Sequence, residues 1–179
     1  MFECMALNAD YQWVSEHRII KSTTGIIANV RHDHVEQLGS ALLQIARSLS
    51  STDPQGRPLY TAETNPEVVN VLTKEIKAVD EEILRTSSDS ITDDDIKGFH
   101  PLAYKTNIAH SLEVSMAHGV GKEVALEAMR KTARGPGASK IHCHERNDQK
   151  LWWANFFGVN DVASAEINID KILIGWAMM

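Results

Sequence analysis

One short apolar stretch places the strongest constraint on the fold of this chain. Residues 25–28, Gly-Ile-Ile-Ala, are uncharged and include two β-branched isoleucines, which is typical of a buried strand in a parallel sheet. The strand is expected to run to Val30, within the polar cluster Asn29-Val30-Arg31-His32-Asp33-His34. Ligands of open α/β sheets bind outside the carboxyl ends of the strands. The stretch therefore predicts an α/β fold with a ligand site near residues 29–34.

The remaining elements alternate helical patterns with a few short strands. Apolar residues at three- and four-residue steps predict helices over 10–18, 34–50, 66–85, 107–118, 122–131 and from 163 onward. Strands are expected over 59–62 and 151–157, the second with Trp152 and Trp153 in the core. Pro66 is expected to open its helix, and Gly119 to follow the end of another. This alternation indicates an α/β protein with a mostly parallel sheet.

The composition of the chain argues against several classes of protein. The formal net charge is −6 and Lys and Arg do not cluster, which argues against a nucleic-acid partner. Two distant cysteines, Cys4 and Cys143, indicate a reducing compartment rather than a disulfide framework. No apolar run approaches the roughly 18 residues that span a bilayer, and no signal-peptide pattern is present at the N-terminus. We therefore expect a cytoplasmic protein.

Both ends of the sequence interrupt an element. Residues 1–6 have the pattern of the end of a strand rather than its start. Residues 172–179 stop inside an apolar helical pattern without a capping Gly or a basic last turn. We therefore expect this chain to be a fragment of a longer protein.

His32 and His34 are the first candidates for ligand binding. In a continuing strand they would point to the same side and could ligate a metal; alternatively, His32 is exposed and His34 caps the next helix. His142-Cys143-His144 has ligand-type residues, but a zinc site needs a second pair and only Cys4 remains as another thiol. Lys21-Ser22-Thr23 lacks the preceding glycines with which a P-loop wraps phosphate in backbone N–H groups. The local pattern therefore excludes a P-loop and leaves metal binding open.

Four stretches share a family pattern: residues 3–12 (Glu-Cys-Met-Ala-Leu-Asn-Ala-Asp-Tyr-Gln), residues 25–38 with Asn-Val-x-x-Asp-His, residues 107–119 followed by Ala138-Ser139-Lys140, and residues 155–161 (Asn-Phe-Phe-Gly-Val-Asn-Asp). Together they resemble the Mur-ligase superfamily of ATP-dependent amide ligases, and within it the ligase subunit of capsule poly-γ-glutamate synthase. The resemblance covers residues 1–50 and 104–170, whereas 51–103 diverge. It implies a partial Mur-ligase-type central ATPase domain, built from a mostly parallel sheet with helices, in which the P-loop strand and helix are missing.

The resemblance implies a magnesium site near the strand end. Glu3 and His34 correspond to the family's Mg²⁺ ligands beside the γ-phosphate of ATP, and Asn29 and Asp33 would hold the strand end in place. Without the resemblance, Glu3 reads as a lone surface carboxylate.

The resemblance also implies a nucleotide site. Asn107 corresponds to the family's adenine-contacting asparagine and Asp161 to its ribose-contacting aspartate, although both residues also fit helix N-caps by propensity alone. Lys140 stands where the family has a catalytic arginine near the phosphates, so it keeps the charge but loses the planar guanidinium fork. The implied cofactors are ATP and Mg²⁺.

The implied reaction is ATP-dependent formation of an amide bond through an acyl phosphate, with glutamate or poly-γ-glutamate as substrate. Residues 1–148 would form a truncated central ATP-binding domain and 149–179 the start of the C-terminal ligase domain. Membrane-bound capsule-synthesis subunits, which would hold the protein at the inner face of the membrane, and an oligomer are further expectations. Because the glycine-rich P-loop is missing, we expect this chain alone to bind ATP weakly and not to catalyse ligation.

Two alternatives belong to other classes of protein. The chain can be a non-catalytic remnant or an assembly partner that another chain completes. It can also be a metal-dependent hydrolase that uses His32, His34 and residues 142–144.

Overall fold

A three-stranded parallel sheet forms the first part of the protein. The structure is a computed structural model that describes residues 2–77, 83–100, 102–132, 138–159 and 161–177. Strands β1 (Gly25–Ile27), β2 (Leu59–Thr61) and β3 (Ile83–Arg85) pair in this order, with Gly25 opposite Leu59 and Leu59 opposite Ile83. Parallel strands need crossover connections, and helices provide them here. The expected α/β fold with a parallel sheet is confirmed.

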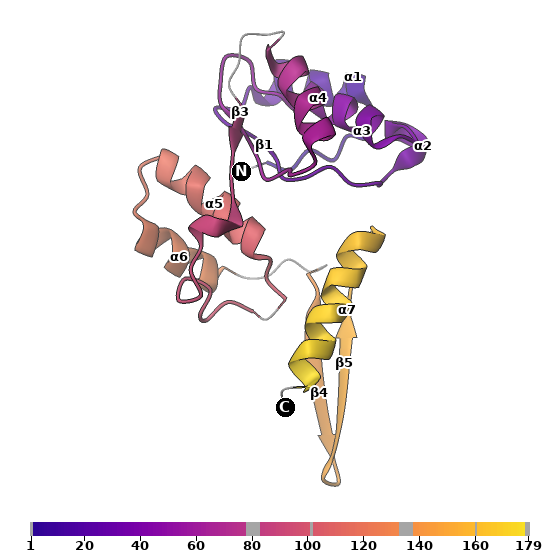
Figure 1. The fold of residues 1–179 in the computed structure, drawn as a ribbon, viewed down its shortest axis with the longest axis vertical. Coiled ribbons are helices and arrows are strands. Elements are labelled where there is room, and N and C mark those ends of the chain that lie inside the picture. Colours follow the sequence, from indigo (N-terminus) through magenta and orange to yellow (C-terminus); the bar gives the residue numbers. More distant parts are fainter. Residues whose placement is uncertain (1, 78–82, 101, 133–137, 160, 178–179) are drawn as a thin grey trace.

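The first hydrophobic core lies between this sheet and two helices (Figure 1). α3 (Leu42–Leu49) belongs to the β1–β2 connection, as does the single turn α2 (Val35–Leu38), and α4 (Pro66–Lys77) belongs to the β2–β3 connection. The apolar residues of α4 recur at three- and four-residue steps and so face the sheet as one stripe. The buried members of this core are Ile27, Val30, Ile45, Ala46, Leu59, Val68, Val71, Leu72 and Ile76. Pro66 opens α4, as expected.

A second core lies between α5 (Lys105–Ala117) and α6 (Lys122–Lys131). Gly119 follows α5 with a φ of +83°, the left-handed conformation that ends helices and that glycine adopts without strain. The buried members of this core are Ile91, Ile108, Ala109, Leu112, Ala125 and Leu126. Both helices are confirmed close to their expected bounds.

The last part of the chain is a β-hairpin followed by a helix. β4 (Lys140–Arg146) pairs antiparallel with β5 (Gln149–Asn155), and α7 (Val162–Ala177) follows. Asn147 and Asp148 form the two-residue turn with φ values of 51° and 60°, as a type I′ hairpin turn requires. Figure 1 shows the hairpin and α7 at the far end of the molecule from α1–α4. The domain boundary expected after residue 148 falls in this turn.

The chain before β1 is helical but irregular. α1 (Ala9–Val14) continues into a π-helix, Ser15–Ile20. Residues 2–6 contain no strand, so the expectation of a strand end there is wrong for the described residues. Two 3₁₀ turns complete the described helical elements, Ser50–Thr52 and Ser88–Ser90.

Two long helices were expected where the structure has shorter elements. The helix expected over 34–50 is broken at Gly39, whose φ of +111° is incompatible with helix continuation, so α2 and α3 are separate. The helix expected over 66–85 is wrong at its end, because Ile83 pairs with Leu59 in the sheet. Part of that expectation, residues 78–82, lies outside the described residues.

The strand expected over 151–157 is only partly correct. β5 ends at Asn155, and its partner β4 was not expected. Trp152 and Trp153 are 39% and 46% exposed, so the expectation that they lie in the core is wrong. One face of Trp153 is instead covered by His142 on β4, whose ring stacks on it with centroids 4.0 Å apart.

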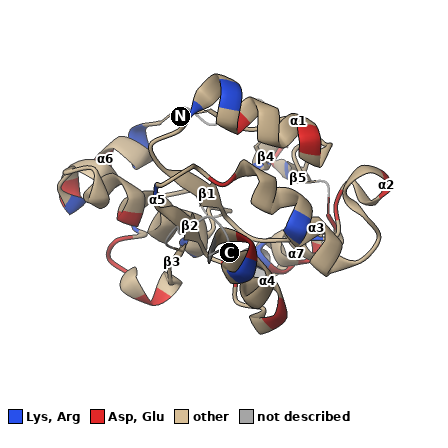
Figure 2. Cartoon of the chain, turned by 90° about the horizontal axis from the view of Figure 1, so that it is seen from above, with Lys and Arg blue, Asp and Glu red and all other residues tan. Residues whose placement is uncertain are grey.

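The described part of the molecule presents mixed charge and no candidate membrane span. Figure 2 shows Lys and Arg interspersed with Asp and Glu over the helices rather than gathered on one face. No helix among the described residues combines the length and the apolar character needed to cross a bilayer.

A buried histidine connects the two cores. The side chain of His110 on α5 is hydrogen-bonded through Nδ1 to Thr86 Oγ1 at 2.7 Å. The Thr86 amide donates in turn to the carbonyl of Thr61 at the end of β2, at 2.8 Å. His110 is only 5% exposed, and this burial lowers the pKa of its imidazole.

Replacing Gly25 with Ala should destabilise the protein. An added Cβ would lie 2.5 Å from Cδ of Pro54 and 2.7 Å from Cδ1 of Leu59, which is closer than real side chains approach. We expect a loss of about 1–3 kcal/mol in the free energy of unfolding, the usual cost of overpacking, measured by urea denaturation. The control is Gly121→Ser at the start of α6, where nothing lies within 4 Å of the added Cβ. Equal stability of Gly25→Ala and the wild type would contradict the packing at β1.

Acidification should destabilise the protein through His110. The unfolded chain binds a proton at His110 near its ordinary pKa, whereas the folded state resists protonation until a lower pH. Stability contributed by the neutral ring is therefore complete above the ordinary pKa and falls as the pH drops toward the folded pKa. We expect urea denaturation between pH 7.5 and 5.5 to show that the free energy of unfolding falls less steeply with decreasing pH in His110→Asn than in the wild type.

His144→Gln, which removes an exposed histidine of β4, should keep the slope of the wild type. An unchanged slope in His110→Asn would show that His110 is not the group responsible.

Candidate functional site

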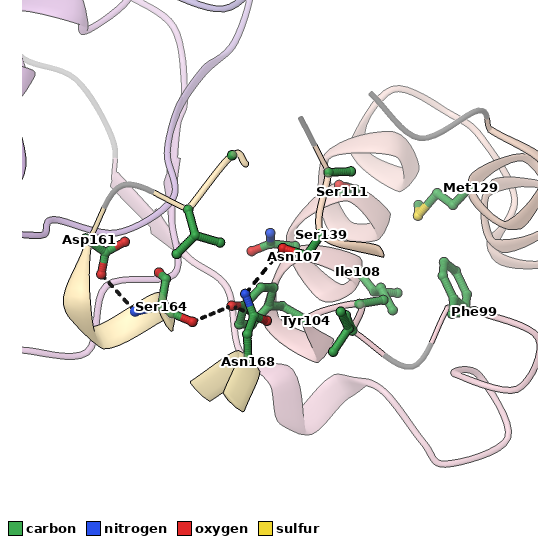
Figure 3. Close-up of a pocket in the computed structure, with 15 residues that line it drawn as sticks. Phe99, Tyr104, Asn107, Ile108, Ser111, Met129, Ser139, Asp161, Ser164 and Asn168 are labelled. Carbon is green, nitrogen blue, oxygen red and sulfur yellow. Dashed lines mark hydrogen bonds between the residues drawn. The ribbon is translucent and has the colours of Figure 1, made fainter. Parts of the chain in front are cut away.

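A cavity of about 480 Å³ lies where α5, the start of the hairpin and the start of α7 meet (Figure 3). Its apolar wall includes Phe99, Leu102, Ile108, Met129 and Val159, and its polar side chains are Tyr104, Asn107, Ser111, Ser139, Asp161, Ser164 and Asn168. A concave, largely apolar cavity with a few converging polar groups is the usual form of a small-molecule site. Asn107 and Asp161, which lie far apart in the sequence, line it together.

Asn107 reaches this cavity from within α5. The helix begins at Lys105 with Tyr104 as its N-cap, so Asn107 is its third residue and not the cap that propensity alone favours. The next residue, Ile108, is buried in the second core and anchors this turn of the helix. The exposed Asn107 amide is therefore available to the cavity on a rigid element.

Asp161 caps the start of α7. Its Oδ1 accepts a hydrogen bond from the backbone N–H of Ser164 at 2.9 Å. Burial raises the pKa of the Asp161 carboxyl, but hydrogen bonds from Ser164 and the positive charge of Arg31 outweigh it and hold this pKa below its ordinary value. The cavity therefore has a carboxylate, a hydrogen-bond acceptor, at this position at neutral pH.

A buried polar network fixes α7 against the start of α5. The Tyr104 hydroxyl donates to Oδ1 of Asn168 at 2.9 Å, and Nδ2 of Asn168, which is 1% exposed, donates to Oγ of Ser139 at 3.5 Å. Lys171 Nζ donates to the carbonyl of Ala103 at 2.8 Å and lies 4.2 Å from the centre of the Tyr104 ring. Burial lowers the pKa of Lys171 and raises that of Tyr104. Sequence reasoning missed this network, although a polar Asn168 between Ile167 and Ile169 was a usable signal.

The turn after β1 (residues 28–34) contains His34, one of the two expected Mg²⁺ ligands. β1 ends at Ile27 rather than at Val30, so the alternative in which His32 and His34 lie on a continuing strand is wrong. Oδ1 of Asp33 accepts the His34 backbone N–H at 2.8 Å and lies 3.0 Å from its ring Nδ1. His34 itself is exposed, has a φ of +48°, and makes no side-chain cap to α2.

A carboxylate that sequence reasoning missed holds this turn to the sheet. Oε2 of Glu63, which is 7% exposed, accepts the backbone N–H of Val30 at 2.8 Å, and Oε1 accepts the N–H groups of Thr64 and Asn65. Such buried, charge-assisted hydrogen bonds are strong. Glu63 thus anchors this turn, and the anchoring roles that the resemblance implied for Asn29 and Asp33 stay predictions.

Arg31 in the same turn was also missed. Its positive charge helps to hold the pKa of Asp161 below its ordinary value, and it opposes part of the rise that burial causes in the pKa of Tyr104. The turn and the cavity therefore lie within electrostatic reach of each other.

The other expected site residues lie outside the cavity lining. Lys140 begins β4, directly after the lining residue Ser139. Glu3 is exposed in the segment before α1, which is attached by a hydrogen bond from Nε2 of Gln12 to the carbonyl of Ala6 at 3.0 Å. Within the described ranges, no three His, Cys, Asp or Glu side chains are grouped so as to hold a metal ion. The roles of Lys140, Glu3 and His34 stay predictions.

Comparison with known proteins gives two curated relatives. The chain is 29% identical over 169 residues to the PGA synthase CapB of Bacillus subtilis (strain 168), a match that covers 94% of this chain and 42% of the relative. It is 26% identical over 162 residues to the capsule biosynthesis protein CapB of Bacillus anthracis, which covers 90% of this chain and 34% of the relative. This chain thus spans less than half the length of either relative.

Other comparisons add little. No protein-family model matches the chain. A solved structure titled "FPGS-AMPPCP complex" matches 38% of this chain and 17% of its own, at 22% identity and a TM-score of 0.35. The two curated matches each extend over at least nine tenths of this chain. They confirm the resemblance to the poly-γ-glutamate synthase ligase subunit, because the chain is similar to two CapB proteins over at least nine tenths of its length.

Proposed function

We propose that this chain supplies the adenosine-binding part of an ATP-dependent carboxylate–amine ligase that acts in poly-γ-glutamate synthesis. One observation carries the proposal: Asn107 and Asp161, to which the resemblance assigns adenine and ribose, line the same cavity. Asn107 reaches it from α5 and Asp161 from the cap of α7, which precede and follow the hairpin in the sequence, respectively. The similarity to PGA synthase CapB supports the assignment to poly-γ-glutamate synthesis.

The chemistry of the cavity suits a nucleoside. Phe99, Ile108 and Met129 provide apolar surface for the faces of a base. The Asn107 amide has both a donor and an acceptor and can pair with an adenine edge, as asparagine does elsewhere. The Asp161 carboxylate only accepts hydrogen bonds, which matches the hydroxyl donors of a ribose.

In the proposed reaction the γ-phosphoryl group of ATP moves to a substrate carboxylate, which gives an acyl phosphate and ADP. The amino group of glutamate then attacks the acyl carbon, phosphate leaves, and one proton is released as the amide forms. Lys140, at the start of β4, would neutralise charge on the phosphoryl group. Glutamate as substrate, membrane-bound capsule-synthesis subunits as partners, and the division at residue 148 belong to this proposal.

The residues expected to bind Mg²⁺ do not match the ligand preference of this ion. Mg²⁺ prefers oxygen ligands in octahedral geometry, whereas Glu3 and His34 offer one carboxylate and one imidazole. No described contact joins these two side chains, and the described residues form no three-membered metal cluster. The alternative of a metal-dependent hydrolase gains no support from the same observation, and the alternative of an assembly partner stays a prediction.

Substitutions in the cavity should weaken nucleotide binding by residues 1–179. We expect Asn107→Leu and Asp161→Asn each to raise the Kd for ATP about tenfold or more, the loss of roughly 1.4 kcal/mol. Asn is also a good N-cap, so α7 should keep its start in the second variant. That variant therefore removes only the negative charge and the carboxylate oxygen that would accept a hydrogen bond from the ribose. Competition with a fluorescent ATP analogue measures the change, and ADP and AMP should compete as well.

Matched controls are Asn70→Leu on the exposed surface of α4 and Asp93→Asn, whose side chain is 93% exposed. Both should bind ATP like the wild type. Wild-type affinity in both cavity variants, or no binding of any adenosine nucleotide, would refute the proposal.

A further inference from the structure

A second pocket lies at the end of the π-helix Ser15–Ile20, next to the loop that contains Arg57, and it shares no lining residue with the first cavity. Its volume is about 370 Å³. The lining side chains that matter here are Glu16, His17, Arg18, Lys21, Ser22 and Arg57. We call it the basic pocket.

The basic pocket has an excess of positive charge. Three cationic side chains line it, Arg18, Lys21 and Arg57, against one carboxylate. That carboxylate, Glu16, is engaged by Ser22, because its Oε1 accepts the Ser22 backbone N–H and hydroxyl, both at 2.7 Å. A concave site with converging cations concentrates anions.

His17 adds a buried polar atom to the wall of the pocket. Its side chain is 5% exposed, and its Nε2 lies 2.8 Å from the carbonyl oxygen of Asp53 and 3.4 Å from Oδ1 of the same residue. Because both neighbours are acceptors, Nε2 carries the proton and donates. The other ring nitrogen, Nδ1, is buried and has no hydrogen-bond partner among the described residues. Such atoms are rare in folded proteins and call for an explanation.

The backbone around the pocket is also unusual. π-helices are rare and occur frequently at functional sites. Lys21, which ends this one, has a φ of +51°, a left-handed conformation that costs a non-glycine residue free energy. The Lys21 backbone N–H, which donates to the carbonyl of Glu16 at 2.7 Å, maintains that conformation.

We propose that the basic pocket binds the oxyanion of a small molecule, a phosphate or carboxylate group, through Arg18, Lys21 and Arg57. His17, held by Asp53 through Nε2, adds a polar ring to the wall beside these three cations. The site differs from a P-loop, since side-chain cations rather than a glycine-rich backbone hold the anion. It is independent of the nucleotide cavity, so either proposal can fail without the other.

NMR titration of ¹⁵N-labelled residues 1–179 tests this proposal. Inorganic phosphate and L-glutamate are added in separate arms at constant ionic strength, with chloride as the reference anion. We expect saturable shifts of the Lys21, Ser22 and Arg57 amides and of the His17 ring nitrogens in at least one arm. The responding arm identifies the anion as phosphate or carboxylate.

Two variants locate the binding. Lys21→Asn removes the charge while keeping a residue that tolerates positive φ, and Arg57→Gln removes a charge from an exposed loop position. Each should weaken binding about tenfold, whereas Lys97→Asn, a 78% exposed lysine elsewhere, should not. Arg57→Gln keeps the test decisive if Lys21→Asn fails to fold. No saturable shift in either arm, or equal affinity in both pocket variants and the wild type, would overturn the proposal.

Discussion

The hydrogen-bonded chain from Thr61 through Thr86 to His110 is the interaction on which the rest of the structure depends. It joins the end of β2 to α5, and so joins the sheet core to the core between α5 and α6. All three residues are at least 92% buried, and Thr61 takes part through its backbone carbonyl, so losing either hydrogen bond would leave a buried polar group unpaired at a cost in stability. Because Asn107 lies about one helical turn before His110, the same contact sets the rotation and height of Asn107 relative to the sheet.

The opposite wall of the cavity that Asn107 lines is held in the same manner. Asn168 is buried in α7 and satisfied by Tyr104 and Ser139, so α7 can dock in only one register without breaking that network. That register places the helix cap, Asp161, at the cavity. The apolar surface between the two walls is left uncovered by the described residues, which is the condition for a ligand cavity rather than a packed interface.

Local sequence patterns correctly predicted the helices that are marked by apolar spacing and by a Gly or Pro at one end. α5 and the start of α4 follow from apolar spacing, Gly119 and Pro66. Ile83 continued the helical spacing of α4, and periodicity alone cannot distinguish a short buried strand from another helical turn. Asn107 and Asp161 came from the family resemblance, whereas Glu63 and Arg31 act on partners more than 30 and 70 residues away, respectively, and no local pattern encodes such contacts.

The two pockets differ in the side chains that line them, and therefore in the ligands that they favour. The first is apolar with a carboxylate that hydrogen bonds and Arg31 keep ionised, so it favours a neutral base and the hydroxyls of a sugar over an isolated anion. The second has three cations and an engaged carboxylate, so it favours an anion and offers no apolar wall to a base. Arg31 lies in the turn at the carboxyl end of β1, where bound ligands of parallel sheets lie. Its positive charge acts on Asp161 and Tyr104 and so helps to keep the Asp161 carboxyl ionised at the start of α7.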